Sequence, residues 1–205
     1  MEEENPGGDE LRADETLTEL GDEPAGAPAS GIVIFSGAEL GGRYRILSRI
    51  GAGGMGEVWH AFDLKLRVEV ALKALRSDVL ASERRREQLR REVRAAREVV
   101  SPNVCRIYDL EEFAGCELIS MEYIDGQTLL SVLRERGPLG LKEAQDIASQ
   151  FLSGLEAIHA AGLVHRDIKP ENIMVTRAGR VVVMDFGVAR QHAKGGGSAS
   201  GTPGY

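Results

Sequence analysis

The sequence has few cysteines, few basic residues near its start and no long apolar run, and each scarcity excludes a class of protein. Its two cysteines, Cys105 and Cys116, have the spacing of neither a metal site nor a redox motif, so we expect both to be apolar residues in or near strands. No stretch approaches the roughly 20 apolar residues that cross a bilayer. The acidic start, Met1 to Glu4, is unlike a signal peptide. We expect a cytoplasmic protein, with an anchor beyond Tyr205 left open.

Acidic residues dominate the beginning of the chain. Residues 1–42 hold eleven acidic residues and one basic residue, whereas the whole chain has a net charge of −7, so the remainder is mildly basic. That balance is too weak to indicate a nucleic acid as the main partner. We predict an acidic, disordered N-terminal extension over residues 1–42, because burial there cannot offset the entropy of ordering. Its apolar island Ile32–Phe35 is either a strand laid against the domain, which we favour, or a docking motif.

Two polar loops near the end of the chain carry the chemistry. The first contains Asp167 and Asn172, and the second places Asp185 directly after the β-branched run Val181–Val183 and Met184. Phosphoryl transfer needs a carboxylate to orient a hydroxyl nucleophile and further oxygen ligands to hold Mg²⁺ against the nucleotide phosphates. These three side chains can supply all of those groups.

His165-Arg166-Asp167 with Asn172, followed by Asp185-Phe186-Gly187, resembles the catalytic loop and metal-binding motif of protein kinases. Lys169 is typical of the serine/threonine branch, and the resemblance to bacterial kinases of the eukaryotic-like type covers about residues 44–205. It implies that Asp167 orients the substrate hydroxyl and that Lys169 stabilises the moving phosphoryl group. It implies Asn172 and Asp185 as ligands of Mg²⁺, with Mn²⁺ as an alternative. His165 has a structural role in this interpretation, packing with Phe186.

A glycine-rich hairpin precedes these loops. The strand Tyr44–Ile50, the turn Gly51–Gly56 and the returning strand Glu57–Phe62 form a hairpin, whereas a dinucleotide-binding turn would run into a helix. The context therefore favours a kinase-type lid over ATP. Val70–Lys73 matches the family's V-A-I-K pattern with Leu for Ile, which implies that Lys73 contacts the phosphates.

A helix is predicted over Ser82–Val100, with Ser82 as its cap. Its inward stripe is expected to consist of Leu89, Val93, Ala96 and Val100. Glu92 lies beside this stripe and is therefore the acid expected to pair with Lys73. The helix also carries seven arginines, which we interpret as a solvated face rather than a nucleic-acid surface because no aromatic residues are interleaved.

The strands Val104–Glu111 and Glu117–Tyr123 complete a five-stranded small lobe. The segment Met121–Gly126 resembles the hinge that binds adenine through backbone groups, and Asp125 is a candidate ribose contact. The resemblance implies one set of residues around ATP. These are Ile50, Gly51, Ala52, Gly53, Gly54, Met55, Gly56, Val58, Ala71, Lys73, Glu122, Tyr123, Asp125 and Met174.

The predicted fold is α+β, a two-lobed kinase fold with a small lobe of five antiparallel strands and one helix at about residues 43–124. A mainly helical large lobe follows at about 125–205. Its helices are expected at Leu129–Arg136 and at Lys142–Ala160, where an apolar stripe includes Ala148 and Leu152. The final run Gly201–Tyr205 resembles the family's G-T-x-x-Y. We therefore expect an incomplete large lobe and, for this fragment alone, poor stability and no activity.

The predicted function is that of a protein serine/threonine kinase in signalling, which transfers the ATP γ-phosphate to proteins and autophosphorylates at Ser198 or Ser200. Two alternatives stay open: a non-catalytic nucleotide-binding module and a small-molecule phosphotransferase. The intact Lys73, Asp167, Asn172 and Asp185 argue against the non-catalytic module, whereas the expected incomplete large lobe argues for it. Small-molecule phosphotransferases usually lack the complete set of motifs. Dimerisation is left open.

Overall fold

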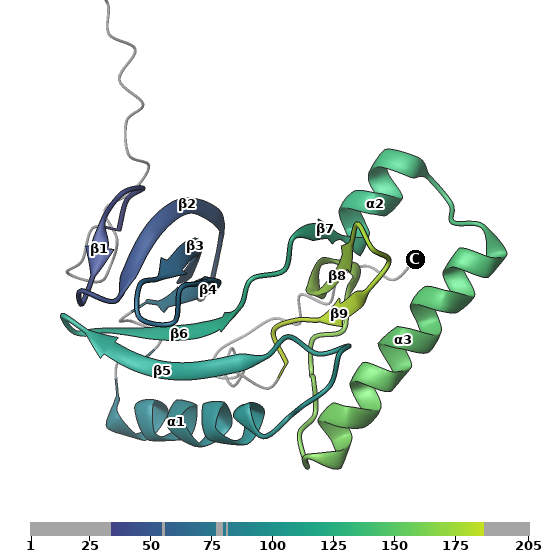
Figure 1. The fold of residues 1–205 in the computed structure, drawn as a ribbon. Coiled ribbons are helices and arrows are strands. Elements are labelled where there is room, and N and C mark those ends of the chain that lie inside the picture. Colours follow the sequence, from purple (N-terminus) through teal and green to yellow (C-terminus); the bar gives the residue numbers. More distant parts are fainter. Residues whose placement is uncertain (1–33, 55, 77–79, 81, 187–205) are drawn as a thin grey trace, which may run out of the picture.

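The computed structural model describes residues 34–54, 56–76, 80 and 82–186. Figure 1 shows a curved sheet with one helix along it and, beyond a connecting segment, a smaller sheet accompanied by two helices. The predictions for Met55, Gly187 and the serines of residues 188–205 lie outside the described residues. Within the described part, no helix is both long and apolar enough to cross a membrane.

The larger sheet has six strands in the order β1-β2-β3-β4-β6-β5, all paired antiparallel. The strands are β1 (Glu39–Leu40), β2 (Tyr44–Gly53), β3 (Gly56–Asp63), β4 (Val68–Leu75), β5 (Ile107–Phe113) and β6 (Cys116–Glu122). Because side chains alternate along a strand, β4 contributes Leu72 and Ala74 to one apolar cluster and Ala71 and Leu75 to another. Lys73 therefore points to the same face as Ala71.

The sixth strand corrects the prediction of five. β1 pairs with β2 through Glu39 opposite Arg45 and Leu40 opposite Tyr44, although both of its residues fall in the predicted disordered extension. A strand of two residues has no alternation to detect, so the sequence gives no signal for it. The predicted strand Ile32–Phe35 is not formed at its two described residues: Ile34 packs on the core, and Phe35 is exposed.

Helix α1 (Glu83–Arg97) begins where the sequence predicts. The Ser82 side chain accepts a hydrogen bond from the Arg85 backbone N–H at 3.4 Å, and Leu89, Val93 and Ala96 are buried. Val100 is 76% exposed, so its place in the inward stripe is wrong. The helix has already ended at Arg97, and helical spacing no longer applies beyond it.

The second part contains a three-stranded sheet of β7 (Gly126–Thr128), β8 (Ile173–Thr176) and β9 (Val181–Val183). It also contains α2 (Leu129–Arg136), α3 (Leu141–Ala160) and the short 3₁₀ helix η1 (Pro170–Asn172). Helix α3 packs against β9 and buries Ile147, Gly154 and Ile158. Ala148 and Leu152 are exposed, contrary to the predicted stripe, because the described elements cover only the β9 side of α3.

Asp63 closes the β3–β4 turn, and its ionisation should stabilise the fold. Its buried carboxylate accepts hydrogen bonds of 2.9 Å from Arg43 Nε and from the backbone N–H groups of Lys65 and Leu66. Burial alone raises the pKa of Asp63, but these hydrogen bonds outweigh it and lower the pKa below the ordinary value. A carboxyl group with a lowered folded-state pKa stabilises the protein above its unfolded-state pKa, and this contribution is lost as the pH falls through the folded-state value.

We therefore expect Asp63→Asn to lower the free energy of unfolding at pH 7 by roughly 1–3 kcal/mol. The difference from wild type should shrink as the pH falls below about 4, where the Asp63 carboxyl group of the unfolded chain becomes protonated. Urea unfolding at pH 7 and at a pH below about 4 measures this difference in the free energy of unfolding. The variant Asp146→Asn, at an exposed position, serves as the control. A difference that does not change with pH would contradict this interpretation.

Candidate active site

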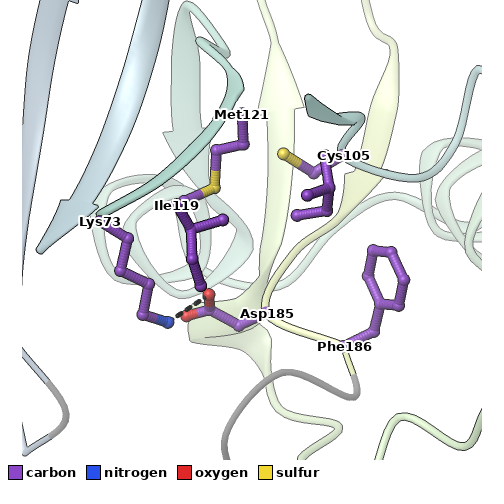
Figure 2. Close-up of a pocket in the computed structure, with 7 residues that line it drawn as sticks. Lys73, Cys105, Ile119, Met121, Asp185 and Phe186 are labelled. Carbon is purple, nitrogen blue, oxygen red and sulfur yellow. Dashed lines mark hydrogen bonds and ion pairs between the residues drawn. The ribbon is translucent and has the colours of Figure 1, made fainter. Parts of the chain in front are cut away.

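Lys73 of β4 and Asp185, two residues beyond β9, form an ion pair in which Lys73 Nζ lies 2.6 Å from Asp185 Oδ1 (Figure 2). Lys73 is only 7% exposed, whereas the Asp185 side chain is 42% exposed. Asp185 has a backbone φ of 55°, in the left-handed region that residues other than glycine rarely adopt. Such backbone strain clusters at functional sites, where the surrounding structure maintains it. The turn after β9 thus presents its carboxylate to the buried lysine.

The loop after α3 and the short helix η1 together gather three of the predicted site residues. Asn172 Nδ2 donates hydrogen bonds of 2.8 Å to both the backbone carbonyl and the Oδ2 of Asp167. Lys169 Nζ lies 3.2 Å from the same Oδ2. The amide orientation leaves Asn172 Oδ1 as an oxygen suited to a cation. Asp167, Lys169 and Asn172 therefore form one cluster, as the spacing of the motif requires.

Met184 joins this cluster to the Lys73–Asp185 pair. Its backbone N–H donates to the Asn172 carbonyl at 2.9 Å, and its carbonyl accepts from His165 Nε2 at 2.8 Å. His165 Nδ1 in turn accepts from the Asp167 backbone N–H at 3.2 Å. His165 is 3% exposed and bonded at both ring nitrogens, which is a structural role. The backbone of Met184, directly before Asp185, is therefore connected through the His165 ring to the backbone N–H of Asp167. These hydrogen bonds fix the position of one polar loop relative to the other.

The glycine-rich hairpin between β2 and β3 is open toward solvent. A Cβ added at Gly51, Gly53 or Gly54 would meet no atom within 4 Å, whereas one at Gly56 would lie 1.8 Å from the Ala74 carbonyl oxygen. Packing therefore requires glycine only at Gly56. Glycine at the other three positions fits the close approach of a ligand to backbone amides.

Apolar residues predicted to lie around ATP converge on one cluster. Ala71 belongs to it, and Val58 of β3 and Met174 of β8 pack against it from different strands. Glu122 and Tyr123 of the predicted hinge are half-buried, and Asp125 is exposed. Ile50, by contrast, is 51% exposed and lies outside this cluster. The cluster therefore brings together side chains from both sheets.

A small pocket beside the Lys73–Asp185 pair was not predicted from the sequence. It is completed by Cys105, Ile107, Ile119, Met121 and Phe186 (Figure 2). Ile119 and Met121 lie on β6, Ile107 begins β5, and Cys105 and Phe186 lie in loops, so no single motif contains these residues. Burial raises the pKa of the Cys105 thiol to about 12, so Cys105 stays a neutral thiol. Both cysteines are buried, which confirms their apolar role.

Glu92 has a contact other than the predicted one. Its carboxylate accepts a hydrogen bond from Gln88 Nε2 at 3.0 Å, while Lys73 pairs with Asp185. Glu92 is nonetheless half-buried beside the apolar stripe of α1, whereas Glu87 and Glu98 are exposed. The Lys73–Glu92 pair stays a prediction.

We expect Glu92→Gln to lower catalytic turnover far more than Glu87→Gln or Glu98→Gln, by roughly tenfold or more, because Glu92 is the acid predicted to orient Lys73 and the other two are exposed. Steady-state assays of the three variants provide the measurement, and the two exposed positions serve as matched controls. Equal losses at all three positions would contradict the predicted Lys73–Glu92 pair.

The two-lobed fold and the polar loops joined at Met184 define a kinase-type scaffold. The Protein kinase domain family matches residues 44–205, and the chain belongs to this family. Membership implies the use of ATP and a divalent metal ion.

Individual relatives agree with this assignment. Serine/threonine-protein kinase PrkC of Bacillus subtilis (strain 168) is 42% identical over 153 residues, which cover 75% of this chain and 24% of PrkC. The chain thus spans about a quarter of the length of that relative. The crystal structure of the Mycobacterium tuberculosis PknI kinase domain matches with a TM-score of 0.67 and 30% identity, covering 78% of this chain and 65% of that chain. The structure of Rad53 1–466 in complex with AMP-PNP matches with a TM-score of 0.63 and 25% identity, covering 71% of this chain and 38% of that one.

Proposed function

We propose that this domain is a protein serine/threonine kinase that transfers the γ-phosphate of ATP to hydroxyl groups of proteins. The observation that carries the proposal is the hydrogen-bonded connection between the two polar loops. Met184 is bonded to both His165 and Asn172, and it directly precedes Asp185. These hydrogen bonds connect the Asp167–Asn172 cluster to the segment that carries Asp185, and Asp185 is paired with Lys73. The names of relatives such as PrkC support the choice of serine and threonine.

The oxygen groups of the site fit Mg²⁺. Among the described residues, no group of three or more His, Cys, Asp or Glu side chains is placed to enclose a metal ion. Mg²⁺ suits such a site, because it keeps several waters and is usually bound by one or two protein oxygens together with substrate phosphates. Asp185 and Asn172 Oδ1 would hold it, and Mn²⁺ has similar ligand preferences. When bound there, the ion would offset the negative charge of the phosphates.

The remaining groups have separate tasks in the proposed reaction. Lys73 binds phosphate oxygens as a point charge, and the open glycines of the β2–β3 hairpin admit those phosphates to backbone amides. Asp167 orients the substrate hydroxyl, and Asn172 Nδ2 fixes the orientation of its carboxylate through the 2.8 Å hydrogen bond to Oδ2. Lys169 lies beside Asp167 with its ammonium group available to developing phosphoryl charge.

The nucleotide base would lie against the cluster that contains Ala71, with Val58 and Met174 packed on it. Backbone groups at Glu122 and Tyr123 would bind its polar edge. AMP-PNP, present in the Rad53 complex, is an ATP analogue and supports an adenine nucleotide as the ligand. We further propose a cytoplasmic location, where ATP is available, and autophosphorylation at Ser198 or Ser200, which lie outside the described residues.

The test is incubation of the complete gene product with Mg²⁺ and γ-labelled ATP, followed by phosphoamino-acid analysis of the protein and of an added acceptor protein. Labelled phosphoserine or phosphothreonine that disappears with EDTA is the expected result. Tight nucleotide binding without transfer would instead establish the non-catalytic module. Transfer of phosphate only to small molecules would instead establish a small-molecule phosphotransferase.

A further inference from the structure

We propose that Arg180 is a positioning residue that clamps the hinge through Glu122 and thereby sets the affinity for the nucleotide. This inference rests on the proposed function, because it concerns how the ATP site is held together. Arg180 directly precedes β9, and Glu122 is the last residue of β6. No motif in the sequence connects these two residues.

The contact is bidentate. Arg180 Nη1 donates to Glu122 Oε1 at 2.6 Å, and Nη2 donates to Glu122 Oε2 at 3.1 Å. The planar guanidinium group thus matches both carboxylate oxygens, which fixes direction as well as distance. The hydrogen bond with Glu122 also raises the pKa of Arg180. The side chains are 36% and 22% exposed, respectively, so water competes only in part for the pair.

The same guanidinium group reaches a third segment. Arg180 Nε donates to the Pro102 carbonyl at 2.6 Å, in the loop that follows α1. One side chain at the start of β9 therefore contacts both the hinge and this loop. A lysine could not make all three hydrogen bonds in this geometry, because its ammonium group is a single point donor on a flexible stem.

Backbone hydrogen bonds connect the clamped segments to the active site. Val183 N–H donates to the Asn103 carbonyl and Cys105 N–H donates to the Val183 carbonyl, both at 2.9 Å, while Glu122 N–H donates to the Arg106 carbonyl at 2.8 Å. The hinge, the 102–106 loop and β9 thus form one hydrogen-bonded unit, and β9 leads to Asp185 through Met184. Arg180 adds a side-chain connection between the hinge and β9.

The expected effect of the clamp falls on binding rather than on the chemical step. Arg180 precedes Asp185 by five positions, and its hydrogen bonds are directed to the hinge and the 102–106 loop rather than to the polar cluster at Asp167. Without the clamp, the backbone groups of the hinge would sample more orientations, and nucleotide binding would have to restrict them. Uniform loss of binding raises KM and leaves kcat nearly unchanged.

The experiment compares Arg180→Ala and Arg180→Lys with wild type in the complete gene product. We expect the KM for ATP to rise roughly tenfold for alanine and less for lysine, with kcat within about twofold. Arg136→Ala is the matched control, because Arg136 makes a similar bidentate pair with Glu143, at 2.8 and 2.9 Å, on the exposed surface of α2 and α3. Its KM should equal that of wild type.

A second measurement does not depend on activity. Hydrogen exchange of the hinge amides at residues 121–125, without nucleotide, should be faster in Arg180→Ala than in wild type and unchanged in Arg136→Ala. An unchanged KM, or a fall in kcat at constant KM, would overturn the clamp. If the wild type neither binds nor turns over ATP, the proposed function fails, and the exchange measurement alone decides the clamp: unchanged hinge exchange in Arg180→Ala overturns it.

Discussion

Asp185→Asn and Lys73→Met should each reduce phosphoryl transfer by at least about 10²–10³-fold, because each removes a charge that offsets phosphate charge in the transition state. The structure explains why the fold should survive both changes. Asparagine has the shape of the half-exposed aspartate, and methionine places an unbranched apolar side chain where Lys73 lies beside Ile119 and Met121. Loss of activity should therefore not result from unfolding.

The measurement is incorporation of labelled phosphate at saturating Mg²⁺ and ATP, with thermal unfolding recorded for the same samples. The double variant provides a further check. Because the two groups act together, the activity of the double variant should be close to that of the less active single variant. It should not be reduced by the product of the two separate losses. Turnover near the wild-type level in either single variant would refute the assignment of the site.

Gly154→Ala should destabilise the protein by roughly 1–3 kcal/mol, although alanine is normally the better residue inside a helix by about 0.5–1 kcal/mol. A Cβ at Gly154 of α3 would lie 2.6 Å from the Asn103 carbonyl oxygen and 2.9 Å from Val183 Cγ2. The Asn103 carbonyl already accepts a hydrogen bond from Val183 N–H at 2.9 Å. The Asn103 carbonyl oxygen thus cannot move away from the new Cβ without breaking its hydrogen bond to Val183 of β9.

Urea unfolding of Gly154→Ala against wild type measures this effect. Ser153→Ala is the matched control in the same helix, since Ser153 is exposed and bonds only to the Ser149 carbonyl among the described contacts. The control should be neutral or slightly stabilising. If Gly154→Ala were also stabilising, the close packing of α3 on the 103–105 segment would be refuted.

Local patterns were sufficient to predict the motif-bearing part of this protein. The cap at Ser82, the hairpin around Gly51–Gly56 and the loop from His165 to Asn172 each depend on residues close together in the chain, and the structure forms all three. The chemistry of Asp167, Asn172 and Lys169 was predictable for the same reason. Their spacing of a few residues already places them on one loop.

Contacts between distant segments were decided only by the tertiary structure. The Lys73–Asp185 pair and the Arg180–Glu122 clamp join residues whose own neighbourhoods give no sign of a partner. Periodicity indicates which face of an element is apolar, but it does not indicate what covers that face. For this reason Leu152, on the predicted stripe of α3, is exposed while Gly154 is buried. The sequence by itself determined the reactive groups and most of the elements, and the packing of those elements determined which groups meet.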